Sequence, residues 1–174
     1  MAPRPRFEAA LDDAFEVRKQ ELGRAPSLDE TETLRQQLFK SWMEAGRFDE
    51  LIAYIHWYYE LEGGRADCAI LCEDLIRQAD LARIEKLFRG LISVRAEAFW
   101  RFWPKAAEGH IGGMRESAHA LSQAMDAYAG LWHGYWALKD EAGQARLQQE
   151  MLQLQQAVRP SSGKQKSKAA KASE

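Results

Sequence analysis

The sequence predicts an all-α protein built from antiparallel helix hairpins, with about seven helices. Apolar residues recur at spacings of three and four along most of the chain, which is typical of amphipathic helices. No segment of strand length alternates convincingly between apolar and polar residues. Five prolines and twelve glycines also leave little material for the turns of an all-β fold. A length of 174 residues suits one domain with a buried core.

Clear start and stop signals mark the first three helices. A first helix is expected over about residues 6–22. Ser27 and Glu30 then form a capping box, in which each residue satisfies a backbone donor at the start of a second helix. The second helix is expected to stop at Ala45-Gly46, and a third at Gly63-Gly64.

The fourth and fifth helices continue the same spacing. Cys68 and Cys72 lie on the apolar stripe of the fourth helix, and the fifth runs on to the aromatic residues before Pro104. Glycines within residues 109–113 predict a loop. A sixth helix is marked by Met114, Ala118, Leu121, Met125, Tyr128 and Trp132.

A bend near Gly130 to Gly134, or at Gly143, is expected before the last helix, which is marked by Leu147, Met151, Leu154 and Val158. Each hairpin carries an apolar stripe that it cannot bury alone, so we expect neighbouring hairpins to stack and remove it from water. An irregular helical bundle would meet the same need and is the alternative arrangement.

Composition divides the chain into three parts: an N-terminal helix and linker over residues 1–26, a helical-repeat domain over 27–159, and a disordered, lysine-rich tail over 160–174. Residues 161–174 carry four lysines and one glutamate, a net charge of +3. Because the whole chain carries −2, residues 1–160 carry −5. An acidic body gives no general attraction to nucleic acid.

Four short turns look alike, and two pairs of them lie 34 positions apart: Gly46 to Asp80, and Gly109 to Gly143. Within residues 38–62, the apolar, aromatic, glycine and acidic positions occur in the order typical of a repeated helix hairpin: Leu38, Trp42, Gly46, Phe48 and Asp49-Glu50. The chain thereby resembles the tetratricopeptide repeat family, and Leu81 to Phe88 resembles a pentatricopeptide second helix. This resemblance implies helix pairs stacked into a short right-handed superhelix.

Neither a signal peptide nor a membrane span is expected, and two cysteines four residues apart are typical of a reducing compartment, so we expect a soluble, cytoplasmic protein. We interpret Cys68 and Cys72 as core residues and expect no metal or other cofactor. His56, Tyr59 and Glu60 share one helix face, where they could do acid–base chemistry or form a simple hydrogen-bonded cluster. No catalytic residue is expected, and the protein is predicted not to be an enzyme.

Six tryptophans are many for this length, and several aromatic runs place rings on more than one face of a helix. Some rings are therefore expected to be exposed, unless neighbouring helices cover both faces, and aromatic residues beside an arginine are typical binding anchors. The candidate partner-binding residues are Tyr54, Trp57, Tyr58, Phe99, Arg101 and Trp103. The sequence thus favours a non-catalytic adaptor, cognate inhibitor or immunity-type protein that binds a protein or peptide.

The alternative function is that of a nucleic-acid-associated accessory protein. Its basic tail would make a weak, salt-sensitive contact with the backbone through Lys164, Lys166, Lys168 and Lys171. The heptad-like spacing of the last helix also permits a homodimer, or equally packing of that helix on the sixth.

Overall fold

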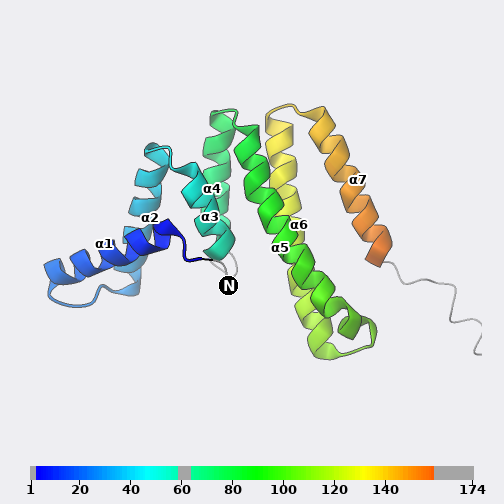
Figure 1. Ribbon diagram of the computed structural model, residues 1–174, viewed down its shortest axis with the longest axis horizontal. Helices are drawn as coiled ribbons and strands as arrows, with labels where there is room; N and C mark the ends of the chain where they lie inside the picture. The colour runs from blue at the N-terminus through cyan, green and yellow to red at the C-terminus, as the bar shows by residue number, and fades with distance from the viewer. Residues whose placement is uncertain (1–2, 59–63, 159–174) are drawn as a thin grey trace, which may run out of the picture.

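The computed structural model describes residues 3–58 and 64–158, and it confirms the all-α class. These residues form seven helices and no strand: α1 (Arg6–Leu22), α2 (Leu28–Glu44), α3 (Phe48–Tyr58), α4 (Gly64–Arg77), α5 (Leu81–Ala107), α6 (Ile111–Ala137) and α7 (Glu141–Val158). From α2 onward the helices run alternately up and down, and α1 lies across α2 and α3 (Figure 1). The long α5–α6 hairpin extends beyond the ends of α4 and α7 (Figure 1).

The same type of turn follows four of the helices. In each turn one residue has a left-handed backbone: Gly46 (φ 70°), Ala79 (φ 54°), Gly109 (φ 87°) and Lys139 (φ 58°). The two hydrogen bonds of a Schellman motif are present each time, in the first turn from Gly46 N–H to the Met43 carbonyl and from Arg47 N–H to the Trp42 carbonyl, both at 2.9 Å. These bonds satisfy carbonyls that the helix end would leave without a partner.

Three of the four similar turns seen in the sequence coincide with these Schellman turns. The fourth, placed around Gly143, is wrong because Glu141 to Gln144 form the first turn of α7, and Lys139 makes the reversal instead. A lysine carries no sequence signal for a left-handed backbone, whereas Gly143 carries one that this position does not use.

Aromatic rings build the core of the N-terminal half. The ring of Phe7, on α1, is fully buried, and its centroid lies 5.8 Å from Phe39, 5.1 Å from Trp42 and 4.4 Å from Tyr54. The first two contacts are edge-on, the geometry that aromatic quadrupoles favour. Helix α1 therefore shares one core with α2 and α3.

Polar contacts fix the start and the placement of α2. The predicted capping box is confirmed: Glu30 N–H donates to Ser27 Oγ at 3.2 Å, and Ser27 N–H donates to the Glu30 carboxylate at 2.7 Å. Further along, the buried Arg35 guanidinium donates to buried Asp67 on α4 and to Glu32 on its own helix. This ion pair ties α2 to α4.

Small side chains let α6 approach α5 closely. The buried residues of α6 recur at spacings of four and three through Gly113, Ser117, Ala120, Ala124, Ala127, Leu131 and Gly134. A Cβ added at Gly134 would lie 2.5 Å from Cγ2 of Ile84, and one at Gly130 would lie 2.2 Å from Cε1 of Phe88. Both glycines therefore serve close packing between helices.

Three expectations for this region are wrong. The chain does not bend at Gly130 to Gly134, because α6 continues to Ala137, and Gly112 and Gly113 belong to its first turn rather than to a loop. Of the residues that marked the sixth helix, Met114, Met125 and Trp132 are exposed instead of buried. Small residues, together with Tyr128, Leu131 and Tyr135, form the packed face.

Helix α7 packs against the body of its own chain. Leu147 is fully buried, and Met151 and Leu154 pack against the core. Arg89 on α5 donates to Glu150 on α7 at 2.5 Å. Within the two described ranges, no helix is both long and apolar enough to cross a membrane.

Candidate functional site

The three candidate residues on α3 are mostly covered. Tyr54 is 0% exposed, so its expected exposure is wrong: α1 places Phe7 over its ring. Tyr58 stacks on Tyr54 at 5.2 Å between centroids, and the Arg35 guanidinium lies 5.8 Å from the Tyr58 ring. Trp57 and Tyr58 are half-buried. Tyr54 is therefore part of the core, and Trp57 and Tyr58 pack against it.

The candidate residues on α5 form a different arrangement. Phe99 is 2% exposed, so its expected exposure is also wrong. The rings of two tryptophans, however, pack against the Phe99 ring. Trp103 stacks on Phe99 at 5.3 Å, and Trp100 meets it edge-on at 4.9 Å. Trp100 is 42% exposed, Trp103 is half-buried, and Arg101 is exposed, with an ion pair to Glu97 at 3.2 Å.

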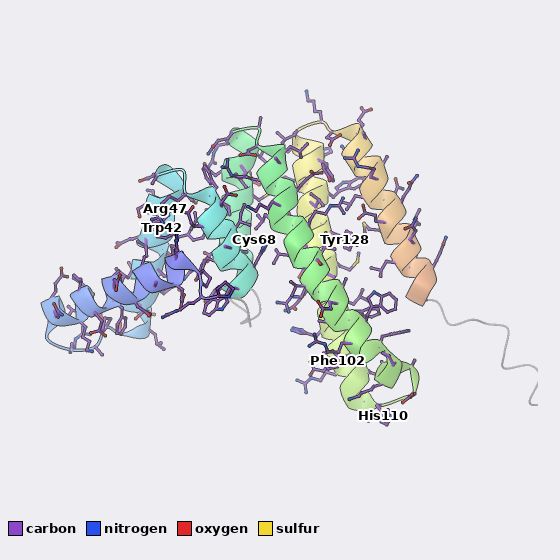
Figure 2. The ribbon with its side chains drawn as sticks, viewed as in Figure 1. Trp42, Arg47, Cys68, Phe102, His110 and Tyr128 are labelled. Atoms are coloured by element: carbon purple, nitrogen blue, oxygen red, sulfur yellow. The ribbon has the colours of Figure 1, made fainter. Side chains whose placement is uncertain are left out.

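We call Phe99, Trp100 and Trp103 the α5 aromatic cluster. It lies on the distal half of the α5–α6 hairpin, the part that extends beyond the ends of α4 and α7 (Figure 1). Figure 2 shows Phe102 on the same distal half and His110 at the hairpin tip, remote from α1 and α2. The buried Phe99 ring contacts both indoles, so packing against Phe99 helps to fix the positions of Trp100 and Trp103.

Helix α6 carries a second exposed apolar surface, which we call the outer stripe. Its members lie on one face, away from the small residues that pack on α5, and are Met114, Ala118, Leu121, Met125, Ala129, Trp132 and Trp136. Trp136 is 64% exposed and Met114 is 53% exposed. Only three of the 27 residues of α6 are Asp, Glu, Lys or Arg, so the helix is apolar on two faces.

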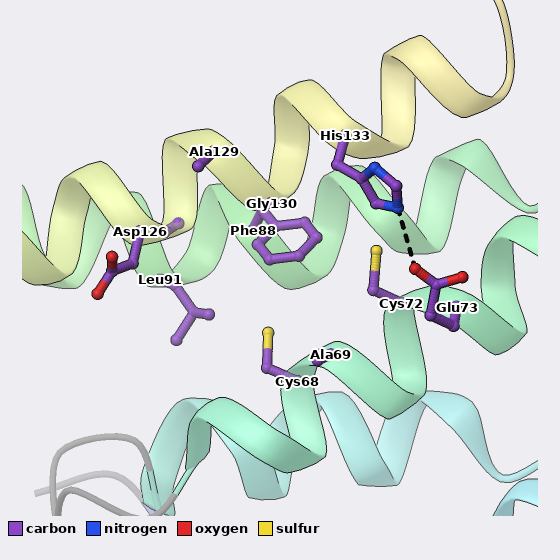
Figure 3. A pocket seen from close by; sticks show the side chains of 11 residues that line it. Cys68, Ala69, Cys72, Glu73, Phe88, Leu91, Asp126, Ala129, Gly130 and His133 are labelled. Atoms are coloured by element: carbon purple, nitrogen blue, oxygen red, sulfur yellow. Dashed lines mark hydrogen bonds and ion pairs between the residues drawn. The ribbon is translucent and has the colours of Figure 1, made fainter.

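A cleft of about 320 Å³ lies between α4, α5 and α6. Its floor is made of the thiols of Cys68 and Cys72 with Phe88 and Leu91, and the backbone of Gly130 lies above them (Figure 3). At one end, His133 on α6 and Glu73 on α4 are joined at 3.0 Å between Nε2 and Oε1 (Figure 3).

The chemistry of this cleft is that of an apolar surface. Burial raises the pKa of the Cys68 thiol to about 12 and that of the Cys72 thiol to about 11. Both are therefore protonated at neutral pH, and a protonated thiol is a poor nucleophile and a poor metal ligand. Across the described part of the chain, no group of three His, Cys, Asp or Glu side chains is placed to hold a metal ion.

His56 is part of the packing between α3 and α5. Its Nε2–H donates to the Leu87 carbonyl at 2.8 Å, and the ring fills the space that Gly90 leaves by having no Cβ. Desolvation lowers the pKa of His56 below 6.5. Tyr59 and Glu60, which were grouped with His56 in the sequence, lie outside the described residues, as do the four tail lysines at positions 164, 166, 168 and 171.

Comparison of this chain with protein-family models, with curated proteins and with solved structures gives no match in any of the three.

The most exposed rings were not among the candidates drawn from the sequence. The sequence does not single out Trp100 and Trp136, because a single residue on a helix of unknown orientation cannot be assigned to a face. One signal was present for α6: it has large apolar residues on one face and glycine and alanine on another, and only one of these faces can pack on α5.

Proposed function

We propose that this protein is a non-catalytic interaction module that binds a protein or peptide partner through the α5 aromatic cluster. The observation that carries the proposal is the exposure of Trp100, with the half-buried Trp103 beside it, on a part of the hairpin that extends beyond the neighbouring helices. Tryptophan and arginine are the residue types that most often dominate binding energy at protein interfaces.

The cluster also favours a partner of a particular kind. Its two indoles are already ordered on Phe99, so little side-chain entropy is lost on binding. The exposed Arg101–Glu97 pair is weak in water, so the guanidinium is free to exchange Glu97 for a partner's carboxylate. The fitting partner offers an apolar groove with an acidic residue beside it.

The architecture supports the same proposal. Helices that alternate in direction and are joined by one recurring turn are typical of helical-repeat scaffolds, which expose long surfaces to other proteins. We propose the short right-handed superhelix of the tetratricopeptide-like proteins as the arrangement of these hairpins.

The test is affinity capture from the cells that express the protein, followed by titration of the purified partner. The double variant Trp100→Ala/Trp103→Ala is compared with wild type and with Leu28→Ala, a control residue that is 90% exposed on α2. We expect the double variant to lose at least about 2 kcal/mol of binding, roughly 30-fold in Kd, and the control to lose nothing. A partner that binds all three proteins equally would refute the proposal.

A further inference from the structure

The outer stripe of α6 is symmetric about its central residue. Counted from Met125, the apolar positions lie at −11, −7 and −4 on one side and at +4, +7 and +11 on the other. Residues at these spacings share one helix face. Two copies of α6 placed antiparallel, with a two-fold axis at Met125, would therefore bring every apolar position of one copy opposite an apolar position of the other.

Side-chain sizes match in that arrangement. Trp132 of one copy lies opposite Ala118 of the other, and Ala129 lies opposite Leu121. At the ends of the stripe, Trp136 lies opposite Met114. At the inner four positions, large residues face small ones, an arrangement that fills an interface without voids. A parallel pair would instead place each tryptophan against its own copy and each alanine against an alanine.

The exposed area is of the right size for such a contact. From typical side-chain areas, the stripe exposes roughly 600 Å² per copy, which approaches the ~800 Å² per partner of a standard interface once flanking residues are added. A monomer rarely leaves an apolar patch of this size in water without a function for it.

One pair of charged groups beside the stripe is complementary, although Asp126 on the same flank lies near its counterpart in the other copy. Arg115 lies ten residues before Met125, and His133 lies eight residues after it on the same flank of the helix. The antiparallel pairing brings Arg115 of one copy alongside the His133–Glu73 pair of the other. A carboxylate on α4 thus faces a guanidinium from the second chain.

Other occupants fit less well. Residues 159–174 have no aromatic, leucine, isoleucine or methionine side chain with which to cover the indoles. A helix that lies on a membrane surface carries many lysines and arginines on its polar face, whereas α6 has Arg115 as its one arginine and no lysine.

We infer that this chain forms a two-fold symmetric dimer in which the α6 helices pack antiparallel through their outer stripes, centred on Met125. A contact of this isologous kind closes on itself and leaves no second stripe exposed for further growth. The distal end of each hairpin then lies along the C-terminal half of α6 in the other copy. The dimer goes beyond the binding function proposed for the α5 aromatic cluster and does not depend on it.

The first experiment measures the mass of the full-length chain in solution by sedimentation equilibrium over a range of concentrations. We expect a species of twice the 19.9 kDa monomer. Ala118→Trp places two indoles against each other and is expected to weaken dimerisation about tenfold or more. Ala53→Trp, at another exposed alanine, on α3, is the matched control and is expected to leave the dimer unchanged.

The second experiment tests the antiparallel register by mild oxidation with oxidised glutathione. In Met125→Cys the two new thiols meet across the axis and are expected to form an intermolecular disulfide in high yield. In Met114→Cys the equivalent atoms lie at opposite ends of the interface, and no such bond is expected. The buried Cys68 and Cys72 contribute no background in the native state.

Three outcomes would overturn the inference: a monomer at every concentration, a dimer that Ala118→Trp leaves intact, or efficient crosslinking through position 114. The double variant Trp100→Ala/Trp103→Ala is expected to remain a dimer. Loss of partner binding with an intact dimer, or the reverse, would therefore separate the two proposals.

Discussion

Close packing of α5 on α6 makes a single added methyl group destabilising. Gly134 is buried in α6, and an alanine Cβ there would lie 2.5 Å from Cγ2 of Ile84, which is itself 0% exposed. Carbon atoms in contact prefer about 3.5–4.0 Å, so the gap is short by more than about 1 Å. Because Cγ2 is bonded directly to the β-carbon, Ile84 cannot withdraw it without changing rotamer or moving α5.

Two opposing effects set the size of the change. Replacing glycine by alanine within a helix stabilises it by about 1 kcal/mol, whereas overpacking a core costs about 1–3 kcal/mol. We expect Gly134→Ala to lose about 1 kcal/mol net, a fall of about 2–4 °C in Tm for a chain of this size. Gly112→Ala, whose Cβ would meet no atom within 4 Å, keeps only the favourable effect and is expected to raise Tm.

Thermal and urea unfolding followed by circular dichroism measure both variants. In the background Ile84→Leu, which moves the branch from Cβ to Cγ, Gly134→Ala is expected to become neutral or stabilising. If Gly134→Ala is at least as stable as wild type in the natural background, the close contact with Ile84 does not limit how near the helices lie, and the reasoning fails.

Three further predictions follow from buried polar groups. Burial holds the pKa of His56 below 6.5, so the unfolded chain binds the proton at a higher pH than the folded chain does. The stability present above pH 6.5 is therefore expected to decline as the pH falls below that value in wild type, and less in His56→Gln, as measured by urea midpoints. Cys68 and Cys72 are expected to resist iodoacetamide at neutral pH until urea unfolds the chain, which mass spectrometry detects; alkylation of the native protein at the rate of a free thiol would contradict this. Asp67→Ala leaves the buried Arg35 without its partner on α4 and is expected to cost about 3 kcal/mol in urea unfolding, while Arg35→Met together with Asp67→Leu recovers much of that loss.

Local sequence signals predicted the elements well where a residue acts on its own backbone. Ser27 and Glu30 form their capping box within four residues, and Gly46 ends a helix because it accepts a positive φ more easily than other residues do. Both effects are set by the chain within one turn. The number of helices and the bounds of α1 and α2 could therefore be predicted from the sequence.

Signals that depend on a distant neighbour were misinterpreted. Gly130 and Gly134 are typical of a bend when only the local sequence is considered. Their actual role is to leave room for the side chains of Phe88 and Ile84 on another helix. Tyr54 has the amphipathic character of a binding residue, but Phe7, some 47 positions earlier, covers it. No local pattern contains that information, so the exposed face of a helix could not be predicted before its neighbours were known.

Helix α6 is an example of a helix whose exposed face could not be predicted from the sequence. A hydrophobic pattern gives the face with the largest residues as the core, yet close packing on α5 requires the smallest ones, and the two demands assign opposite faces. Once the small face is inside, the large residues of the outer stripe, Met114, Met125, Trp132 and Trp136, are left exposed to water. Trp136→Ser is therefore expected to change the unfolding free energy of the isolated monomer by no more than about 0.5 kcal/mol. A larger loss in the monomer would mean that the outer stripe serves the fold, and the case for a partner on it would end there.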